Sequence, residues 1–249
     1  MSRRPSFAAA LVLVILLAAI GTAWAVSKSG SGGASGVVPL KKGDRIVFLG
    51  DSITAGAVGP SGFITIIQAD LAKNRADLGI ECIGAGISGN KVPDLQKRLQ
   101  KDVLDKKPTI VFIYIGINDV WHWNPPKSKG TEKGPYEEGL KDIIARITAA
   151  GARVILCTPT VIGEKPDGTN PRDAMLDEYS DISRKVARET HTQLLDLRKA
   201  FLAFEKANNK ENKASGILTR DGVHLIEAGN RLVAQEMLGA LGVEAAKVE

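Results

Sequence analysis

The chain is poor in cysteine, histidine and aromatic residues. Its 249 residues include 2 Cys and 3 His, and aromatic side chains make up 5%. Two cysteines exclude a scaffold stapled by several disulfides and a zinc site built from several thiolates. The remaining composition, with 44% hydrophobic and 24% charged residues, excludes a disordered chain, a collagen and a coiled coil. The length favours one domain, or at most two small ones.

Strong charge of one sign is also missing. The formal net charge is +5, and two of the positive charges, Arg3 and Arg4, lie in a segment that we expect to be removed. Basic residues form no stripe interleaved with aromatic residues, which is the pattern typical of nucleic-acid binding. We therefore expect no nucleic-acid partner.

The N-terminus has the pattern of an export signal. Arg3 and Arg4 precede an uninterrupted apolar run over 7–20, and Ala-Trp-Ala at 23–25 matches a cleavage site. We predict a signal peptide over 1–25, a flexible Ser/Gly-rich linker over 26–38 and a folded domain over 39–249. The alternative is an uncleaved membrane anchor. Either way the domain is placed outside the cytoplasm, as a secreted, periplasmic or membrane-anchored protein.

Apolar runs alternate with helical patterns along the folded domain. The strongest strand-like run, 109–115, is apolar on both faces, which is typical of a central parallel strand. The predicted strands are 44–49, 80–83, 109–115, 153–158 and 193–197. The predicted helices are 62–74, 93–104, 136–150, 173–190, 199–207 and 226–241. This alternation predicts an α/β fold, with a five-stranded parallel sheet between two layers of helices.

Four polar motifs fall where strands end or where the last helix is about to begin. Gly-Asp-Ser occupies 50–52, Gly-Ile-Ser-Gly-Asn occupies 86–90, Gly-Ile-Asn-Asp occupies 116–119 and Asp-Gly-Val-His occupies 221–224. In a parallel sheet, functional groups gather at the carboxyl ends of the strands. We therefore expect the four motifs to form one site.

The residue types in these motifs suit acyl transfer by a serine nucleophile. Ser52 sits on a tight turn from strand to helix, which exposes its hydroxyl group. His224 can act as the base, and Asp221, three residues earlier, can bind the imidazole N–H and fix its tautomer. The backbone N–H groups of Ser52 and Gly89 and the side-chain amide of Asn118 can form an oxyanion hole.

These residues, in this order, resemble the SGNH or GDSL hydrolase family, whose name refers to Ser52, Gly89, Asn118 and His224. The resemblance extends over about 46–241. It implies a flavodoxin-like three-layer fold with strand order 2-1-3-4-5, and esterase, lipase or related acyl-hydrolase activity without metal or cofactor. The family includes lysophospholipases, thioesterases and acetylesterases that act on polysaccharides.

The chain departs from the family pattern at three positions. Gly84 stands where the family often has Asn, and Asn90 stands where it often has Asp. The first departure removes a supporting hydrogen bond and the second weakens the match of that motif. Ile53 replaces the leucine of the family name, which is an ordinary apolar exchange.

Several of these residues also have purely structural interpretations. Ser52 suits a helix N-cap, and Asp221 suits a cap of the last helix. His122 competes with His224 as the base, although it lacks a carboxylate at the same spacing. Asp51 and Asp119 fit supporting roles in their loops better than catalytic ones.

The loop over 120–135 follows the oxyanion residue and contains Trp121, His122 and Trp123. Aromatic side chains beside a site stack on sugars or line an acyl pocket, so we predict that these three bind substrate. The alternative is that the two tryptophans pin the loop to the body of the domain.

The sequence therefore predicts an exported serine ester hydrolase that acts on a small-molecule, lipid or polysaccharide ester. Two alternatives stay open, namely an acyltransferase that uses a sugar acceptor and a non-catalytic carbohydrate-binding module.

Cys82 and Cys157 should be free thiols. In the implied strand order they lie three strand spacings apart, roughly 14 Å, whereas a disulfide needs Cα atoms within about 7 Å.

Overall fold

The computed structural model describes residues 1, 36–124 and 130–244. Five parallel strands form one sheet in the order β2-β1-β3-β4-β5, which confirms the predicted fold class. The strands are β1 (Arg45–Gly50), β2 (Glu81–Gly86), β3 (Ile110–Tyr114), β4 (Arg153–Cys157) and β5 (Gln193–Leu195). The predicted signal segment, apart from residue 1, and residues 26–35 of the predicted linker lie outside the described residues.

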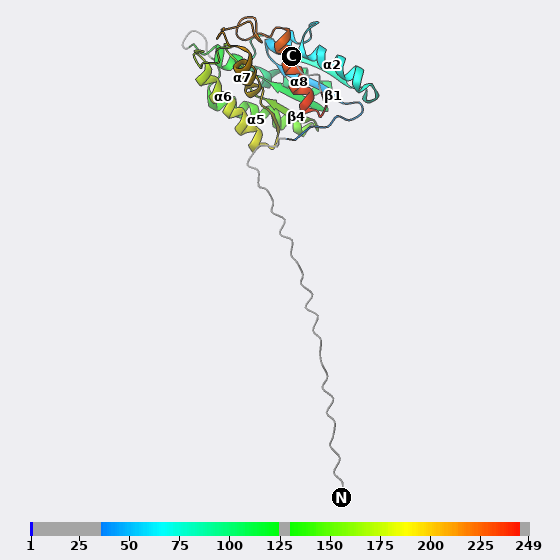
Figure 1. Ribbon diagram of the computed structural model, residues 1–249. Helices are drawn as coiled ribbons and strands as arrows, with labels where there is room; N and C mark the ends of the chain where they lie inside the picture. Colours follow the sequence, from blue (N-terminus) through cyan, green and yellow to red (C-terminus); the bar gives the residue numbers. More distant parts are fainter. Residues whose placement is uncertain (2–35, 125–129, 245–249) are drawn as a thin grey trace. The chain divides into compact units, whose positions relative to one another are not determined.

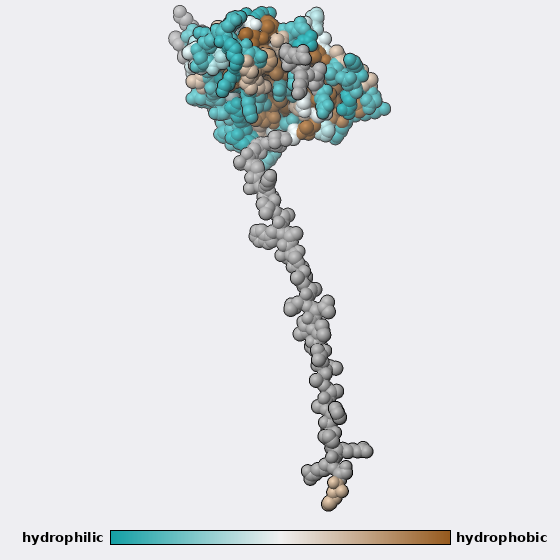
Figure 2. Space-filling model, in the orientation of Figure 1, coloured by the Kyte–Doolittle hydropathy of each residue, from teal (hydrophilic) through white to brown (hydrophobic). Residues whose placement is uncertain are grey.

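The helices pack in two groups that cover the sheet (Figure 1). On one side α2 (Phe63–Asn74) packs against α8 (Glu227–Ala240), and on the other α5 (Lys133–Ala149) lies between α3 (Val92–Asp102) and α6 (Asp173–Glu189). Figure 2 shows hydrophilic side chains over the outer surfaces of α2 and α6, as amphipathic helices on a buried sheet require. Within the described ranges no helix is long and apolar enough to cross a membrane.

Aromatic and aliphatic side chains of the central strands form the core. All five residues of β3 are buried, and the rings of Phe48 and Phe112 stack with their centroids 5.2 Å apart. Phe63 of α2 meets Phe48 edge-on at 6.0 Å. These contacts pack β1 against β3, the central strand of the sheet, which confirms the central position predicted for 109–115.

Element bounds differ from the prediction where backbone pairing overrides residue propensity. β2 continues to Gly86 instead of ending at Ile83, because Gly84, Ala85 and Gly86 pair with the last residues of β1. Two short helices, α1 (Ser52–Gly56) and α4 (Ile117–Trp121), occupy segments that the sequence suggested only as turns or loops. α7 (Leu197–Asn208) begins two residues earlier than predicted because Asp196 caps it by accepting the Lys199 N–H.

The two cysteines are free thiols, as predicted. Cys82 lies on β2 and Cys157 on β4, with β1 and β3 between them. Burial, with the Glu81 carboxylate as a second cause, raises the pKa of the Cys82 thiol to about 12. Burial also raises the pKa of the Cys157 thiol. Both groups are therefore protonated at neutral pH and weakly reactive.

A buried cluster of charged side chains lies between α6, α7 and the loop that follows β4. Arg198 donates to the Thr160 carbonyl at 2.8 Å and to the carboxylates of Asp173 and Asp177. Glu205 is fully buried, and neither of its carboxyl oxygens has a hydrogen-bond partner among the described residues. Burial, reinforced by the negative charge of Glu164, raises the pKa of Glu205 to about 8.

Replacing Glu205 with Gln should flatten the pH dependence of stability. The pKa of Glu205 lies above its ordinary value of 4.5 in the folded chain. Its contribution to stability is therefore complete below that ordinary value and is lost as the pH rises through about 8. We therefore expect the melting temperature of Glu205→Gln, relative to that of the parent chain, to rise as the pH increases from about 5 to about 9.

Thermal melts across this pH range would test the expectation. Glu227→Gln on the exposed surface of α8 is the matched control and should keep the parent's pH slope. An unchanged slope in Glu205→Gln would show that Glu205 does not titrate in the folded chain within this range.

Candidate active site

Ser52 is presented at the carboxyl end of β1. Asp51 is the N-cap of α1, because its carboxylate accepts the Ile53 N–H at 2.9 Å, so Ser52 is the first residue of the helix and not its cap. Gly50 makes the turn possible. A Cβ atom there would lie 2.4 Å from the Tyr114 carbonyl oxygen and 2.2 Å from Thr54 Oγ1. The half-buried Ser52 side chain is thus fixed by its own turn.

Ser52, His224 and Asp221 form a continuous chain of hydrogen bonds. Ser52 Oγ lies 3.0 Å from His224 Nε2, and His224 Nδ1 lies 2.7 Å from Asp221 Oδ2. The serine and the histidine are 172 residues apart in sequence. An imidazole held in this way can accept a proton from the serine hydroxyl at Nε2 while Nδ1 donates to the carboxylate.

Asp221 is organised to carry a negative charge. Its Oδ1 accepts the backbone N–H groups of Val223 at 3.1 Å and His224 at 2.7 Å. Burial opposes ionisation, but these bonds and the one from the His224 ring outweigh it and hold the pKa of Asp221 below its ordinary value. The N-cap of α8 is Ile226, so Asp221 does not cap that helix.

The loop after β2, which carries Gly89, meets the start of α4, which carries Asn118. The Asn118 amide donates to the Asn90 carbonyl at 3.1 Å, and the residue is only 3% exposed. Gly89 is exposed and has a φ of +78°, a left-handed conformation that favours glycine. Backbone and side-chain N–H donors from different loops can in this way face one oxyanion.

Arg98 is a site residue that the sequence prediction missed. From α3 its guanidinium donates to the Asn90 side-chain oxygen at 2.6 Å, to the Ala85 carbonyl at 3.0 Å and to the Gly50 carbonyl at 2.7 Å. It thereby ties the ends of β1 and β2 to the Gly89 loop. The departure from the family pattern at Asn90 has an explanation here, because an amide oxygen accepts the arginine N–H as a carboxylate would. An isolated arginine on a helix carries no sequence signal for this role.

Asp51 and Asp119, the two buried aspartates beside the site, accept hydrogen bonds from backbone N–H groups. Burial is the main cause that raises the pKa of Asp51 to about 7 and that of Asp119 to about 6. Asp119 accepts the Val92 N–H at 3.2 Å through its carboxylate and the Thr131 N–H at 3.1 Å through its carbonyl. It thus fixes both the start of α3 and the return of the loop after α4.

The two predicted tryptophans lie in different surroundings. The Trp121 ring is 38% exposed and lies edge-on to His224, with centroids 6.0 Å apart, and it stacks on His122 at 5.8 Å. Burial, followed by the positive charge of Lys91, lowers the pKa of His122. Trp123 lines a separate hollow of about 690 Å³ beside α5 and α6, and its carbonyl accepts from Arg172. Residues 125–129 of the predicted loop lie outside the described residues.

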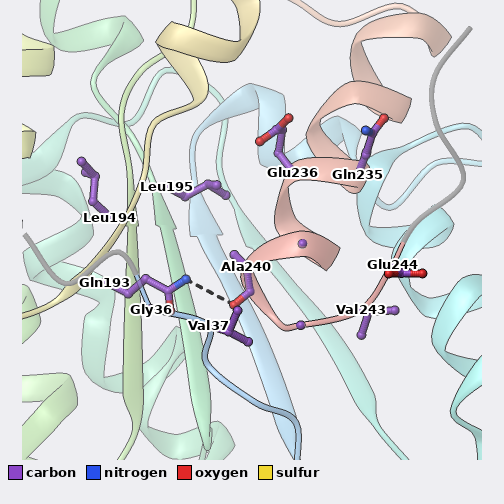
Figure 3. Close-up of a pocket in the computed structure, with 12 residues that line it drawn as sticks. Gly36, Val37, Gln193, Leu194, Leu195, Gln235, Glu236, Ala240, Val243 and Glu244 are labelled. Carbon is purple, nitrogen blue, oxygen red and sulfur yellow. Dashed lines mark hydrogen bonds between the residues drawn. The ribbon is translucent and has the colours of Figure 1, made fainter.

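Another hollow, of about 820 Å³, lies between β5 and the end of α8 (Figure 3). Gln193 and Ala240 both line it, and the Gln193 amide donates to the Ala240 carbonyl at 3.2 Å. None of the predicted site residues lines this hollow.

His191 is exposed and belongs neither to the candidate active site nor to this hollow. In the part of the chain that the structure describes, no group of three His, Cys, Asp or Glu is placed to hold a metal ion.

The chain is similar in sequence to a family of lipases and acylhydrolases and to individual relatives. The sequence model of the GDSL-like Lipase/Acylhydrolase family matches residues 48–232. An acetylxylan esterase from Geobacillus stearothermophilus is 32% identical over 221 residues, which cover 82% of this chain and 97% of that protein. The lipoprotein YqeF of Bacillus subtilis strain 168 is 27% identical over 210 residues, 76% of this chain and 86% of that protein.

The chain also resembles a solved structure of an esterase. The crystal structure of the acetyl xylan esterase AlAXEase superimposes with a TM-score of 0.76 and 45% identity, over 79% of this chain and 99% of that chain. The family match covers most of the chain and includes all four polar motifs in full. The chain therefore belongs to the GDSL-like lipase/acylhydrolase family and is a carboxylic ester hydrolase.

Proposed function

We propose that this protein is an exported serine esterase that removes acetyl groups from a polysaccharide of the acetylated xylan class. The observation that carries the proposal is the hydrogen-bonded chain from Ser52 through His224 to Asp221. Relatives named acetylxylan esterases, at 32% and 45% identity, support the choice of acetyl group and polysaccharide.

In the first half-reaction Ser52 Oγ attacks the ester carbonyl carbon and His224 Nε2 takes the hydroxyl proton. The backbone N–H groups of Ser52 and Gly89 and the Asn118 amide hold the negative charge on the carbonyl oxygen. As the carbon–oxygen bond to the sugar breaks, His224 returns the proton to the departing sugar oxygen. An acetyl group is left on Ser52.

In the second half-reaction water attacks the acetyl-serine. His224 takes a proton from the water, and the same oxyanion donors hold the new tetrahedral intermediate. Its collapse releases acetate and returns the proton to Ser52 Oγ. Asp221 keeps the imidazole in the tautomer that accepts at Nε2 and stabilises its charged form in both halves. The hydrolytic relatives favour water over a sugar as the acyl acceptor.

Export is supported by the N-terminal pattern of basic residues, an apolar run and Ala-Trp-Ala at 23–25. The B. subtilis relative that is named a lipoprotein adds to this support. A polymer as large as xylan is encountered outside the cytoplasm, so an exported location and this substrate are mutually consistent.

Replacing Ser52 with Ala should abolish the nucleophile and leave the fold intact, since its side chain is half-buried at the end of its turn. We expect ester turnover to fall by roughly three orders of magnitude or more. Release of acetate from acetylated xylan and of p-nitrophenol from p-nitrophenyl acetate would measure it. Full turnover by a folded Ser52→Ala protein would remove the serine mechanism.

Replacing Asn118 with Ala should remove an oxyanion donor. We expect a loss of about 3 kcal/mol in transition-state stabilisation, seen as a fall in kcat. Loss of its bond to the Asn90 carbonyl should cost a further contribution of about 1 kcal/mol in folding stability. Steady-state kinetics and a denaturant titration separate the two effects. A raised KM with unchanged kcat would assign Asn118 to ground-state substrate binding instead.

Trp121 is the aromatic residue best placed to contact a sugar, because it is exposed beside His224. Trp121→Ala should lower kcat/KM on acetylated xylan by an amount equivalent to about 1–3 kcal/mol and hardly change turnover of p-nitrophenyl acetate. Trp123→Ala is the matched comparison in the neighbouring hollow. If Trp121→Ala slows both substrates equally and lowers the melting temperature, the ring is a packing residue.

A further inference from the structure

Glu164 is a fully buried carboxylate in the loop that follows β4. Its side chain accepts three consecutive backbone N–H groups from a distant segment. Oε2 accepts from Ile217 at 2.8 Å, and Oε1 accepts from Leu218 at 2.7 Å and from Thr219 at 2.6 Å. That segment ends two residues before Asp221. The mechanism proposed above does not use Glu164.

The Glu164 backbone is itself tied down. Its N–H donates to the Ala214 carbonyl at 3.1 Å, and its carbonyl accepts from the Asn209 amide at 2.6 Å. The preceding residue, Gly163, donates its N–H to the Gly222 carbonyl at 2.8 Å. Residues 163–164 therefore hold the 217–224 segment on both sides of Asp221.

The residues held by the carboxylate are the same ones that shape the turn carrying Asp221 and His224. Thr219 Oγ1 accepts the Gly222 N–H at 2.9 Å, and the Leu218 carbonyl accepts the Ile226 N–H at 2.9 Å. The Arg220 N–H donates to the His224 carbonyl at 2.8 Å and closes the turn. Leu218 and Thr219 are thus bonded to Ile226 and Gly222, which lie on either side of His224 in the chain.

The turn that carries Asp221 and His224 lies outside any helix or strand of the sheet. α8 begins only at Glu227, and the one β-bridge in this segment joins Thr219 to Leu225. The Ser52–His224 bond therefore depends on how firmly residues 217–219 are held. A carboxylate suits the task because its two oxygens only accept. An amide in its place would face one backbone N–H with an NH₂ donor.

We infer that Glu164 is a positioning residue for the catalytic histidine and fixes the His224 imidazole through residues 217–219. The inference rests on the proposed function, since it assigns His224 the role of base. Glu164 does not contact Ser52 or the reacting atoms. Its effect is on the geometry of proton transfer and not on substrate binding.

Two replacements of different severity test the inference. Glu164→Gln keeps the shape and can retain two of the three bonds, whereas Glu164→Ala removes all three. We expect kcat on p-nitrophenyl acetate to fall by on the order of 10- to 100-fold in Glu164→Ala and by less in Glu164→Gln, with KM within about twofold. The mild variant keeps the test valid if the alanine variant does not fold.

Glu205→Gln is the matched control, because Glu205 is equally buried in the same cluster but makes no side-chain hydrogen bond to the described residues. Its kcat should equal that of the parent chain. If Glu205→Gln loses as much kcat as Glu164→Gln, general damage to the cluster explains the result. If both Glu164 variants lose only melting temperature and keep kcat per folded molecule, Glu164 is a scaffold residue. Either outcome overturns the inference.

A spectroscopic measurement separates this inference from the proposed function. The low-field proton NMR signal of His224 Nδ1–H reports the bond to Asp221 whether or not the protein turns over substrate. We expect this signal to broaden or vanish in Glu164→Ala, to persist in Glu205→Gln and to persist in Ser52→Ala. Activity retained in Ser52→Ala would defeat the proposed function, whereas an unaltered signal in Glu164→Ala would defeat the positioning role.

Discussion

The register of the parallel sheet is the constraint on which the rest of the site depends. Gly50 at the end of β1 pairs with Gly86 of β2 on one side and with Tyr114 of β3 on the other. Three polar motifs therefore leave the sheet at the same level. Because all strands run in one direction, the Ser52 turn and the segments that carry Gly89 and Asn118 emerge at a single edge of the sheet.

The remaining part of the site does not emerge from a strand. Asp221 and His224 lie on an irregular segment before α8, and it is this segment that must meet the serine turn. Two charged side chains, one buried and one largely buried, hold these two parts of the site: the strand ends and the segment before α8. Arg98 joins the strand ends to the Gly89 loop, and Glu164 holds the segment that precedes Asp221. In each case one charged group satisfies several backbone or amide partners, which offsets the cost of removing it from water.

Burial raises the pKa of three other carboxyl groups. Asp51, Asp119 and Glu205 all have raised pKa values, and burial is the leading cause in each case. Asp51 and Asp119 each accept a backbone N–H, whereas no hydrogen bond to the described residues compensates the burial of Glu205. Hydrogen bonds therefore favour the anionic form of Asp221, whereas burial favours the neutral forms of Asp51, Asp119 and Glu205.

The sequence by itself determined the fold class, the strand order and the set of proposed catalytic residues. The fold class and the candidate catalytic residues follow from local patterns, namely apolar runs of strand length and short polar motifs at their ends. The strand order was implied by the resemblance to the SGNH or GDSL family that those motifs carry. The tertiary structure decided what local patterns do not carry. It showed that Asp51 and not Ser52 caps α1, and that Trp121 lies against His224 whereas Trp123 lines a hollow beside α5 and α6. It also showed that Asn90 has a partner in Arg98.

Glu164 and Ser52 illustrate the physical reason. Glu164 contacts residues 53 to 55 positions away, and Ser52 meets a histidine 172 positions away. For Ser52 a motif marked the residue in advance, because Gly-Asp-Ser directly after an apolar run is recognisable in the sequence. For Glu164 nothing in the neighbouring sequence distinguishes it from an exposed loop glutamate. Only the packing of the loop after β4 against residues 214–222 buries its carboxylate and aims it at three backbone N–H groups.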